Sequence, residues 1–177
     1  MSASIPERAR WAVEVLDPGA DEHLLEIGCG PGAAAELVCA RLDAGRLLAI
    51  DRSAVAVQRT LRRNAAHMDA GRLEVRQCAL DALDVAPGRL DAVFSVDVNL
   101  FWTRDPAAEL AVLARALRPG GRLLILYGAS GPTTGDRVIS PITAALEAHG
   151  FTGVTPLDDP RGAGLSSTKP GERPARP

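Results

Sequence analysis

Lysine is almost absent from this chain. Of its 20 basic residues only Lys169 is a lysine, so the sequence offers no interior lysine for Schiff-base chemistry. The 22 acidic residues outnumber the basic ones, which leaves a net charge of −2. Proteins that bind nucleic acid mainly through its phosphates usually carry a clear basic excess, so this balance disfavours nucleic acid as a partner.

Cysteine and long apolar runs are also scarce. Cys29, Cys39 and Cys78 are odd in number and form no CxxC pair, which indicates neither a disulfide framework nor a zinc site. No apolar run approaches the roughly 20 residues of a membrane-spanning helix, and the N-terminus has no apolar core typical of a secretory signal. We therefore expect a cytoplasmic protein with no bound metal and no membrane partner.

What the chain does contain is enough apolar material for one domain. It has 177 residues, of which 46% are apolar. A domain of this length buries about two-thirds of the surface that its unfolded chain exposes. We place a single domain over residues 1–169, and we expect residues 170–177, which hold one alanine as their only apolar residue, to be disordered.

Short apolar runs alternate with segments whose apolar residues recur at helical spacing. The runs, each short enough for a strand, cover residues 23–28, 46–51, 73–79, 90–96 and 122–128. The helical segments cover residues 32–45, 52–68, 105–121 and 140–150. This alternation predicts a doubly wound α/β fold, with a parallel sheet and helices on both faces. Residues 151–159 and 164–170 are weaker strand candidates, expected to form an antiparallel hairpin at one edge.

Two of the expected helices have clear boundary signals. Asp105 is predicted to cap the third helix with Pro106 at its first position, and Pro119-Gly120 follow its end. The last helix repeats the pattern, with Ser140 as the cap, Pro141 at the first position and Gly150 as the stop.

The stretch "LLEIGCGPG", residues 24–32, joins the first expected strand to the first expected helix. In a doubly wound sheet this turn is the usual ligand contact, and Gly28, Gly30 and Gly32 would let a ligand approach the backbone closely. Asp51, about 20 residues further on, is placed to accept hydrogen bonds from a ribose diol. These features also satisfy the dinucleotide pattern GxGxxG/A, in which Ala33 takes the last position.

Glu26 bears on the choice between these ligands. Its carboxylate would repel a pyrophosphate a few ångströms away, whereas it would attract a cation. S-adenosylmethionine carries a sulfonium, an ammonium and a ribose, and it has no phosphate. The sequence also lacks a Tyr-x-x-x-Lys pair for hydride transfer. The dinucleotide interpretation is weaker for both reasons.

From about residue 11 to residue 128 the sequence resembles the class I S-adenosylmethionine-dependent methyltransferases. "LLEIGCGPG" is similar to their first motif, "LLAIDRS" to their second, "RLDAVFSVDV" to their fourth, and "LARALRPGGRLLIL" to the helix and strand that follow. The resemblance implies a Rossmann-like, seven-stranded and mostly parallel sheet with an antiparallel C-terminal edge strand. It also implies a methyltransferase that uses S-adenosylmethionine and releases S-adenosylhomocysteine.

Residue roles follow from the same resemblance. It implies that Glu26, Gly28, Gly30, Gly32 and the Cys29 backbone hold the cofactor, with Asp51 on the ribose hydroxyls and Arg52 beside the adenine. Many members have an Asp for the adenine amino group where this chain has Ala79, and Asp81 is a candidate substitute. We add Leu80 and Ser95, so that the expected cofactor set is Glu26, Gly28, Cys29, Gly30, Gly32, Asp51, Arg52, Ala79, Leu80, Asp81 and Ser95.

The fourth motif departs from the family at its end. Many small-molecule members have Leu-Glu-His where this chain has Asn99-Leu100-Phe101, so their histidine cannot be transferred to this sequence. The chain also lacks the Asn-Pro-Pro-Tyr stretch that marks methylation of nucleic-acid amino groups. As candidate catalytic residues we name Asp97, Asn99 and Tyr127, which follow or end expected strands. Asn99, Phe101 and Trp102 are candidates for the substrate side, with core packing as the alternative for the two aromatic residues.

Few residues precede the first strand, and no large insertion follows the fifth, which suggests an open acceptor site. A second subunit in a homodimer could close it, or residues 129–140, whose glycines permit movement. We expect a small-molecule acceptor. A methyltransferase for RNA or protein and a non-catalytic S-adenosylmethionine-binding domain remain as alternatives.

Overall fold

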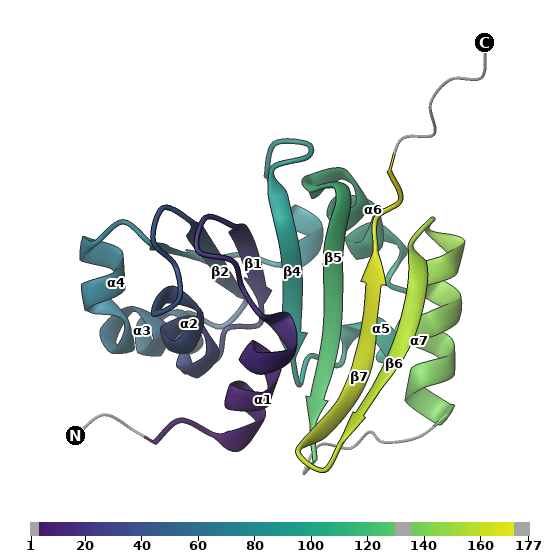
Figure 1. The fold of residues 1–177 in the computed structure, drawn as a ribbon, viewed down its shortest axis with the longest axis horizontal. Helices are drawn as coiled ribbons and strands as arrows, with labels where there is room; N and C mark the ends of the chain where they lie inside the picture. Colours follow the sequence, from purple (N-terminus) through teal and green to yellow (C-terminus); the bar gives the residue numbers. More distant parts are fainter. Residues whose placement is uncertain (1–3, 130–135, 172–177) are drawn as a thin grey trace.

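A computed structural model describes residues 4–129 and 136–171 (Figure 1). Most of the expected tail, and part of the proposed closing segment 129–140, lie outside these ranges. The elements, in chain order, are α1 (Glu7–Leu16), β1 (His23–Ile27), α2 (Ala33–Cys39), β2 (Arg46–Asp51), α3 (Ala54–Arg63), α4 (Ala65–Asp69), β3 (Leu73–Gln77), the 3₁₀ turn η1 (Leu80–Ala82), β4 (Leu90–Val96), α5 (Leu100–Thr103), α6 (Ala107–Ala116), β5 (Leu117–Gly128), α7 (Asp136–Ala148), β6 (Thr152–Asp159) and β7 (Gly162–Thr168).

The strands form one seven-stranded sheet in the order β3-β2-β1-β4-β5-β7-β6. Neighbours from β3 to β5 are parallel, whereas β7 runs antiparallel to both β5 and β6. The predicted fold class and the C-terminal hairpin are therefore confirmed. Because the chain leaves β1 toward β2 and β3 and returns on the other side as β4, the strand order reverses between β1 and β4. Ligands of doubly wound folds bind at the carboxyl ends of such a strand pair.

Each face of the sheet carries its own apolar cluster. Alternate strand residues such as Leu24 and Phe94 pack with α1 and α2 on one face. Their neighbours Leu25 and Val93 pack with α5, α6 and α7 on the other. Figure 1 shows α1, α2 and α3 in front of the sheet and α6 and α7 behind it. Burial on both faces explains why the central strands are nearly continuous apolar runs.

Helix α1 was not predicted from the sequence, and neither was the short helix α5. Trp11 of α1 is buried, and a Cβ atom at Gly162 would come within 2.6 Å of the Trp11 ring. Arg161 Nη1 bonds Glu14 Oε2 at 2.6 Å, and Arg122 Nη1 donates to the Leu16 carbonyl at 2.5 Å. These contacts fix α1 against β5 and β7, with its N-terminal turn close to the carboxyl ends of β4 and β5.

The predicted start of the last helix is wrong. Helix α7 begins at Asp136, so Pro141 lies inside it and Ser140 is no cap. Val138, Ile142 and Leu146 recur every four residues and are all buried. Their burial favours a helix that extends back beyond the proline, although the missing N–H costs one backbone hydrogen bond.

Other boundaries also shift; β5 begins at Leu117 and not at residue 122, and α2 ends at Cys39 and not at residue 45. Helix α6 begins at Ala107 with Pro106 as its N-cap, so the predicted cap Asp105 lies one residue too early, although its Oδ1 accepts a hydrogen bond from Ala107 N at 3.0 Å. Pro119 and Gly120 belong to β5, which directly follows α6. Gly150, with φ of +80°, ends α7 as predicted.

Candidate functional site

The glycine turn between β1 and α2 depends on its glycines. Gly28, Gly30 and Gly32 have φ angles of 71°, 53° and 78°, a region that residues with a Cβ atom rarely adopt. A Cβ atom at Gly28 would lie 2.6 Å from Val98 Cγ2. Gly28 N and Cys29 N donate to the Ile50 carbonyl at 2.8 and 3.0 Å, which ties the turn to the end of β2.

Asp51, the last residue of β2, lies directly beside this turn. Its Oδ2 accepts from Gly30 N at 3.0 Å, and its Oδ1 accepts from Ser53 N at 2.9 Å. Thus the two sequence features separated by about 20 residues meet in space, as the motif predicts.

A cavity of about 590 Å³ opens at the carboxyl ends of β1, β2 and β4. This volume lies in the range of small-molecule sites. The expected site residues in its lining are Gly28, Asp51, Arg52, Ala79, Leu80, Asp81, Asp97 and Asn99. The cavity thus brings together residues from the ends of four strands and the segments that follow them.

A smaller cavity of about 250 Å³ lies on the other side of the glycine turn. Both cavities have Gly28, Val96 and Asp97 in their lining, so they adjoin. The smaller one adds Glu26, Cys29 and Gly30 from the expected set, together with Arg8 of α1.

Glu26 is only 3% exposed, and its Oε2 is buried with no hydrogen-bond partner among the described residues. Burial, and to a smaller extent the nearby Asp51 carboxylate, raise the pKa of this carboxyl to about 8. Near neutral pH the side chain is therefore mostly protonated. A cation placed beside it would supply the missing partner and favour the ionised form.

Arg8 and Asp97 join α1 to the end of β4 across the smaller cavity. Arg8 Nε lies 2.9 Å from Asp97 Oδ2, and Asp97 Oδ1 accepts from Gly128 N at 2.8 Å. Asp97 has a left-handed backbone with φ of 59°, which is uncommon for a residue other than glycine. Arg8 could not be predicted from the sequence, because its position at the cleft depends on how α1 packs.

Three residues of the expected cofactor set remain to be described, namely Cys29, Gly32 and Ser95. Thr60 Oγ1 donates to Cys29 Sγ at 3.3 Å, and burial raises the pKa of the Cys29 thiol to about 12, so this thiol is a poor nucleophile. Gly32 is the N-cap of α2 and lines neither cavity. Ser95 also lies outside both linings and is fully buried.

The structure contradicts Tyr127 as a catalytic residue facing an acceptor. Its side chain is 0% exposed, and its hydroxyl donates to the Val98 carbonyl at 3.0 Å. Burial and the nearby Asp97 carboxylate raise the pKa of the phenol further. Asp97 has both carboxylate oxygens engaged, as described above. Asn99 is exposed in the larger cavity and remains free to contact an acceptor.

For Phe101 and Trp102 the structure favours core packing, the alternative named above. Phe101 is 1% exposed in the core, and Trp102 packs partly buried against the same cluster. Leu100, Thr103 and Arg104 line the cavity instead. Positions i, i+3 and i+4 share one face of a helix, so the short helix α5 turns its aromatic residues inward. Helical spacing after Asn99 could have revealed this.

Two searches of the described part of the chain were negative. It contains no group of three or more His, Cys, Asp or Glu residues that could hold a metal ion. Among the helices within residues 4–129 and 136–171, none is long and apolar enough to cross a membrane.

Comparison with known proteins shows the family to which this chain belongs. A family model described as "Methyltransferase domain" matches residues 24–121. The chain is 32% identical over 122 residues to trans-aconitate 2-methyltransferase of Paracidovorax citrulli, covering 67% of this chain and 45% of that one. It is 33% identical over 148 residues to ribosomal RNA small subunit methyltransferase C of Ectopseudomonas mendocina, covering 78% and 43%.

A similar fold is found in the crystal structure of an S-adenosylmethionine-dependent methyltransferase from Aquifex aeolicus. The TM-score is 0.75 with 16% identity, and the match covers 92% of this chain and 90% of that one. By contrast, the chain spans about a third to under a half of the length of the curated relatives that it matches.

The pKa of Glu26 has a consequence for stability. Because the pKa is about 8 in the folded protein and near 4.5 when unfolded, the folded state holds its proton more tightly. The associated stability is complete below about pH 4.5 and is lost as the pH rises toward 8. We expect Glu26→Gln, which stays neutral, to gain stability relative to the wild type from pH 5 to pH 8. Urea unfolding of the ligand-free proteins at several pH values measures this difference.

The exposed Glu147 supplies the matched control. Glu147→Gln should show no such trend relative to the wild type. Parallel pH profiles for the wild type and Glu26→Gln would contradict the placement of Glu26.

Proposed function

This chain belongs to the class I S-adenosylmethionine-dependent methyltransferases, and on that premise we propose that it transfers the methyl group of S-adenosylmethionine to a small-molecule acceptor. The observation that carries the proposal is Glu26, a buried carboxyl with an unpartnered oxygen beside the glycine turn. A pyrophosphate there would be repelled by an ionised Glu26, whereas an ammonium would be bound by it.

In this proposal the nucleoside end of the cofactor occupies the larger cavity. Asp51 accepts hydrogen bonds from the ribose hydroxyls, because its carboxylate lies at the cavity edge and already orders the turn. Arg52, Ala79, Leu80 and Asp81 surround the place of the adenine. Asp81 is exposed and can accept the amino hydrogen where the family often has an acid at the position of Ala79.

The amino-acid end lies in the smaller cavity, between two groups of opposite charge. Glu26 holds the ammonium, and Arg8 on the facing helix holds the carboxylate. Arg8 is already within reach, since its guanidinium pairs with Asp97 on the wall shared by both cavities. The backbone of Gly28 and Gly30 lets the chain between these groups pass close to the turn.

When bound, S-adenosylmethionine supplies a methyl group on a sulfonium sulfur, which is transferred by in-line displacement. The protein contributes mainly alignment and exclusion of water, because charge is dispersed rather than created in this reaction. The glycine turn and Asp51 fix one reactant, and Val98, Asn99 and Leu100 form the facing wall. Asn99 can orient an acceptor by hydrogen bonding, and Asp97 is a positioning residue held by Arg8 and Gly128.

The acceptor class rests on the relatives and on charge. Trans-aconitate 2-methyltransferase is named for a small organic acid, and the net charge of −2 disfavours RNA. The relative named as a ribosomal RNA methyltransferase keeps RNA as the second candidate. A homodimer that closes the open cleft and a cytoplasmic location stay predictions.

Cofactor choice is tested by comparing S-adenosylmethionine with NAD. We expect S-adenosylmethionine to raise the melting temperature and NAD to leave it unchanged, because stabilisation follows binding to the folded state. Asp51→Asn should weaken binding of S-adenosylhomocysteine about ten-fold in calorimetry, since a hydrogen bond to a charged group, worth about 1.5 kcal/mol, is weakened. Asp84→Asn, at an exposed position outside the cleft, is the control. Undiminished binding by Asp51→Asn, or equal stabilisation by NAD, would contradict the assignment.

The role of Arg8 is tested with a cofactor that lacks its carboxylate. Arg8→Gln should bind S-adenosylhomocysteine about ten-fold more weakly, because one charge-assisted contact is removed. Decarboxylated S-adenosylhomocysteine should bind the variant and the wild type equally well. Arg10→Gln changes an exposed arginine two residues further along α1 and should alter neither affinity. A similar loss for both ligands would show that Arg8 acts only through the shape of the cleft.

A further inference from the structure

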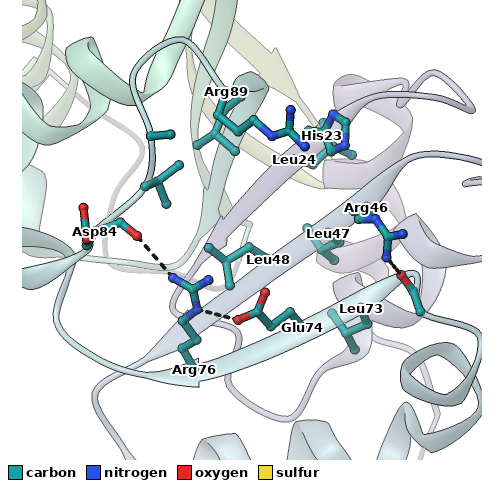
Figure 2. A pocket seen from close by; sticks show the side chains of 14 residues that line it. His23, Leu24, Arg46, Leu47, Leu48, Leu73, Glu74, Arg76, Asp84 and Arg89 are labelled. Carbon is teal, nitrogen blue, oxygen red and sulfur yellow. Dashed lines mark hydrogen bonds and ion pairs between the residues drawn. The ribbon is translucent and has the colours of Figure 1, made fainter.

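A third cavity lies at the opposite end of the sheet from the cofactor cleft. It has a volume of about 410 Å³ and is built where β1, β2, β3 and β4 begin (Figure 2). Strand β2 runs from Arg46 in this cavity to Asp51 in the cleft. At about 3.3 Å per residue these two strand ends are about 16 Å apart. No described residue lines both cavities.

The cavity exists because, among the described residues, no helix packs on β2 and β3 on one face of the sheet. The connection from β3 to β4 contains only the three-residue turn η1, whereas α2, α3 and α4 cover β2 and β3 on the other face. On the uncovered face Leu48 and Val85 are only partly buried, and Leu90 adds a buried apolar side chain. An apolar floor of this kind is typical of small-molecule sites.

Positive charge gathers on one rim. Figure 2 shows Arg89, His23 and Arg46 on one side of the cavity, across from Arg76 and Asp84. Among the described residues, Arg89 has no ion pair or side-chain hydrogen bond. Arg46 bonds only the Gly71 carbonyl and has no carboxylate partner within those ranges.

Most of the other charges near the cavity are paired, but among the described residues the carboxylate of Asp84, across the cavity from Arg46 and Arg89, has no ion pair. Arg76 Nε bonds Glu74 Oε1 at 2.6 Å, and its Nη1 donates to the Asp84 carbonyl at 3.2 Å. Asp91 lies behind His23, where it accepts from the His23 backbone N–H at 2.7 Å and pairs with Arg118. The two guanidinium groups without a carboxylate therefore belong to Arg46 and Arg89.

We propose that this cavity binds an organic anion, with the apolar body on Leu48, Val85 and Leu90 and the acidic group against Arg46 and Arg89. Guanidinium groups suit carboxylate, sulfonate and phosphate oxygens, because their N–H donors match two oxygens at once. This site is independent of the cofactor cleft and does not rest on the proposed methyl transfer.

The test uses two fluorescent probes with the same body. 1-Anilinonaphthalene-8-sulfonate carries a sulfonate, and N-phenyl-1-naphthylamine lacks it. Both should bind the folded protein in the presence of saturating S-adenosylhomocysteine. The double variant Arg46→Gln/Arg89→Gln should bind the sulfonate about five-fold more weakly, as expected for two exposed ion pairs, and the neutral probe equally well.

Two further variants complete the test. Arg59→Gln/Arg62→Gln removes two exposed arginines of α3 and should change neither affinity. Ala86→Trp, at an exposed position of the cavity lining, should weaken both probes by filling the space. The proposal is overturned if S-adenosylhomocysteine displaces the sulfonate, if the two double variants behave alike, or if Ala86→Trp leaves both probes bound.

Discussion

The arrangement of the site depends on one buried carboxyl. Glu26 is the next-to-last residue of β1, and its partners in the two neighbouring strands, Ala49 and Phe94, are apolar, so desolvation keeps its proton on near neutral pH. A buried acid with an unpartnered oxygen destabilises the ligand-free protein. This cost is understandable if the site is built for a cation, because an ammonium would restore the missing partner. The glycine turn, Asp51 and Arg8 are all arranged around this one group.

Helix α1 forms part of the lining of the smaller cavity. It packs through Trp11 and is fixed by Arg161 and Arg122, and it carries Arg8 over the end of β4. Arg8 pairs with one carboxylate oxygen of Asp97, and the other oxygen accepts a hydrogen bond from the backbone N–H of Gly128, the last residue of β5. The carboxylate therefore joins three separate segments. The left-handed backbone of Asp97 is the kind of local strain that is common at functional sites.

What the sequence predicted was set by local or repeating patterns. The alternation of strands and helices, the glycine turn and Asp51 depend on spacing along the chain, and each lies where it was predicted. Tyr127 was misplaced, and Phe101 and Trp102 were left open between core and substrate side, because the surroundings of all three depend on which side of α5 and β5 meets the core. Arg8 was missed since only the packing of α1 brings it to the cleft. The start of α7 was misjudged because burial of Val138 outweighs the preference of Pro141 for a helix start.

The central claim is that Glu26 changes from a neutral acid to the partner of a cation when the cofactor binds. With a pKa of about 8, this side chain is mostly protonated at pH 7. Binding of S-adenosylhomocysteine should then release protons, measured by calorimetry in buffers of different ionisation enthalpy. Glu26→Gln should release none. Binding without proton release in the wild type, or equal release by the variant, would contradict the account.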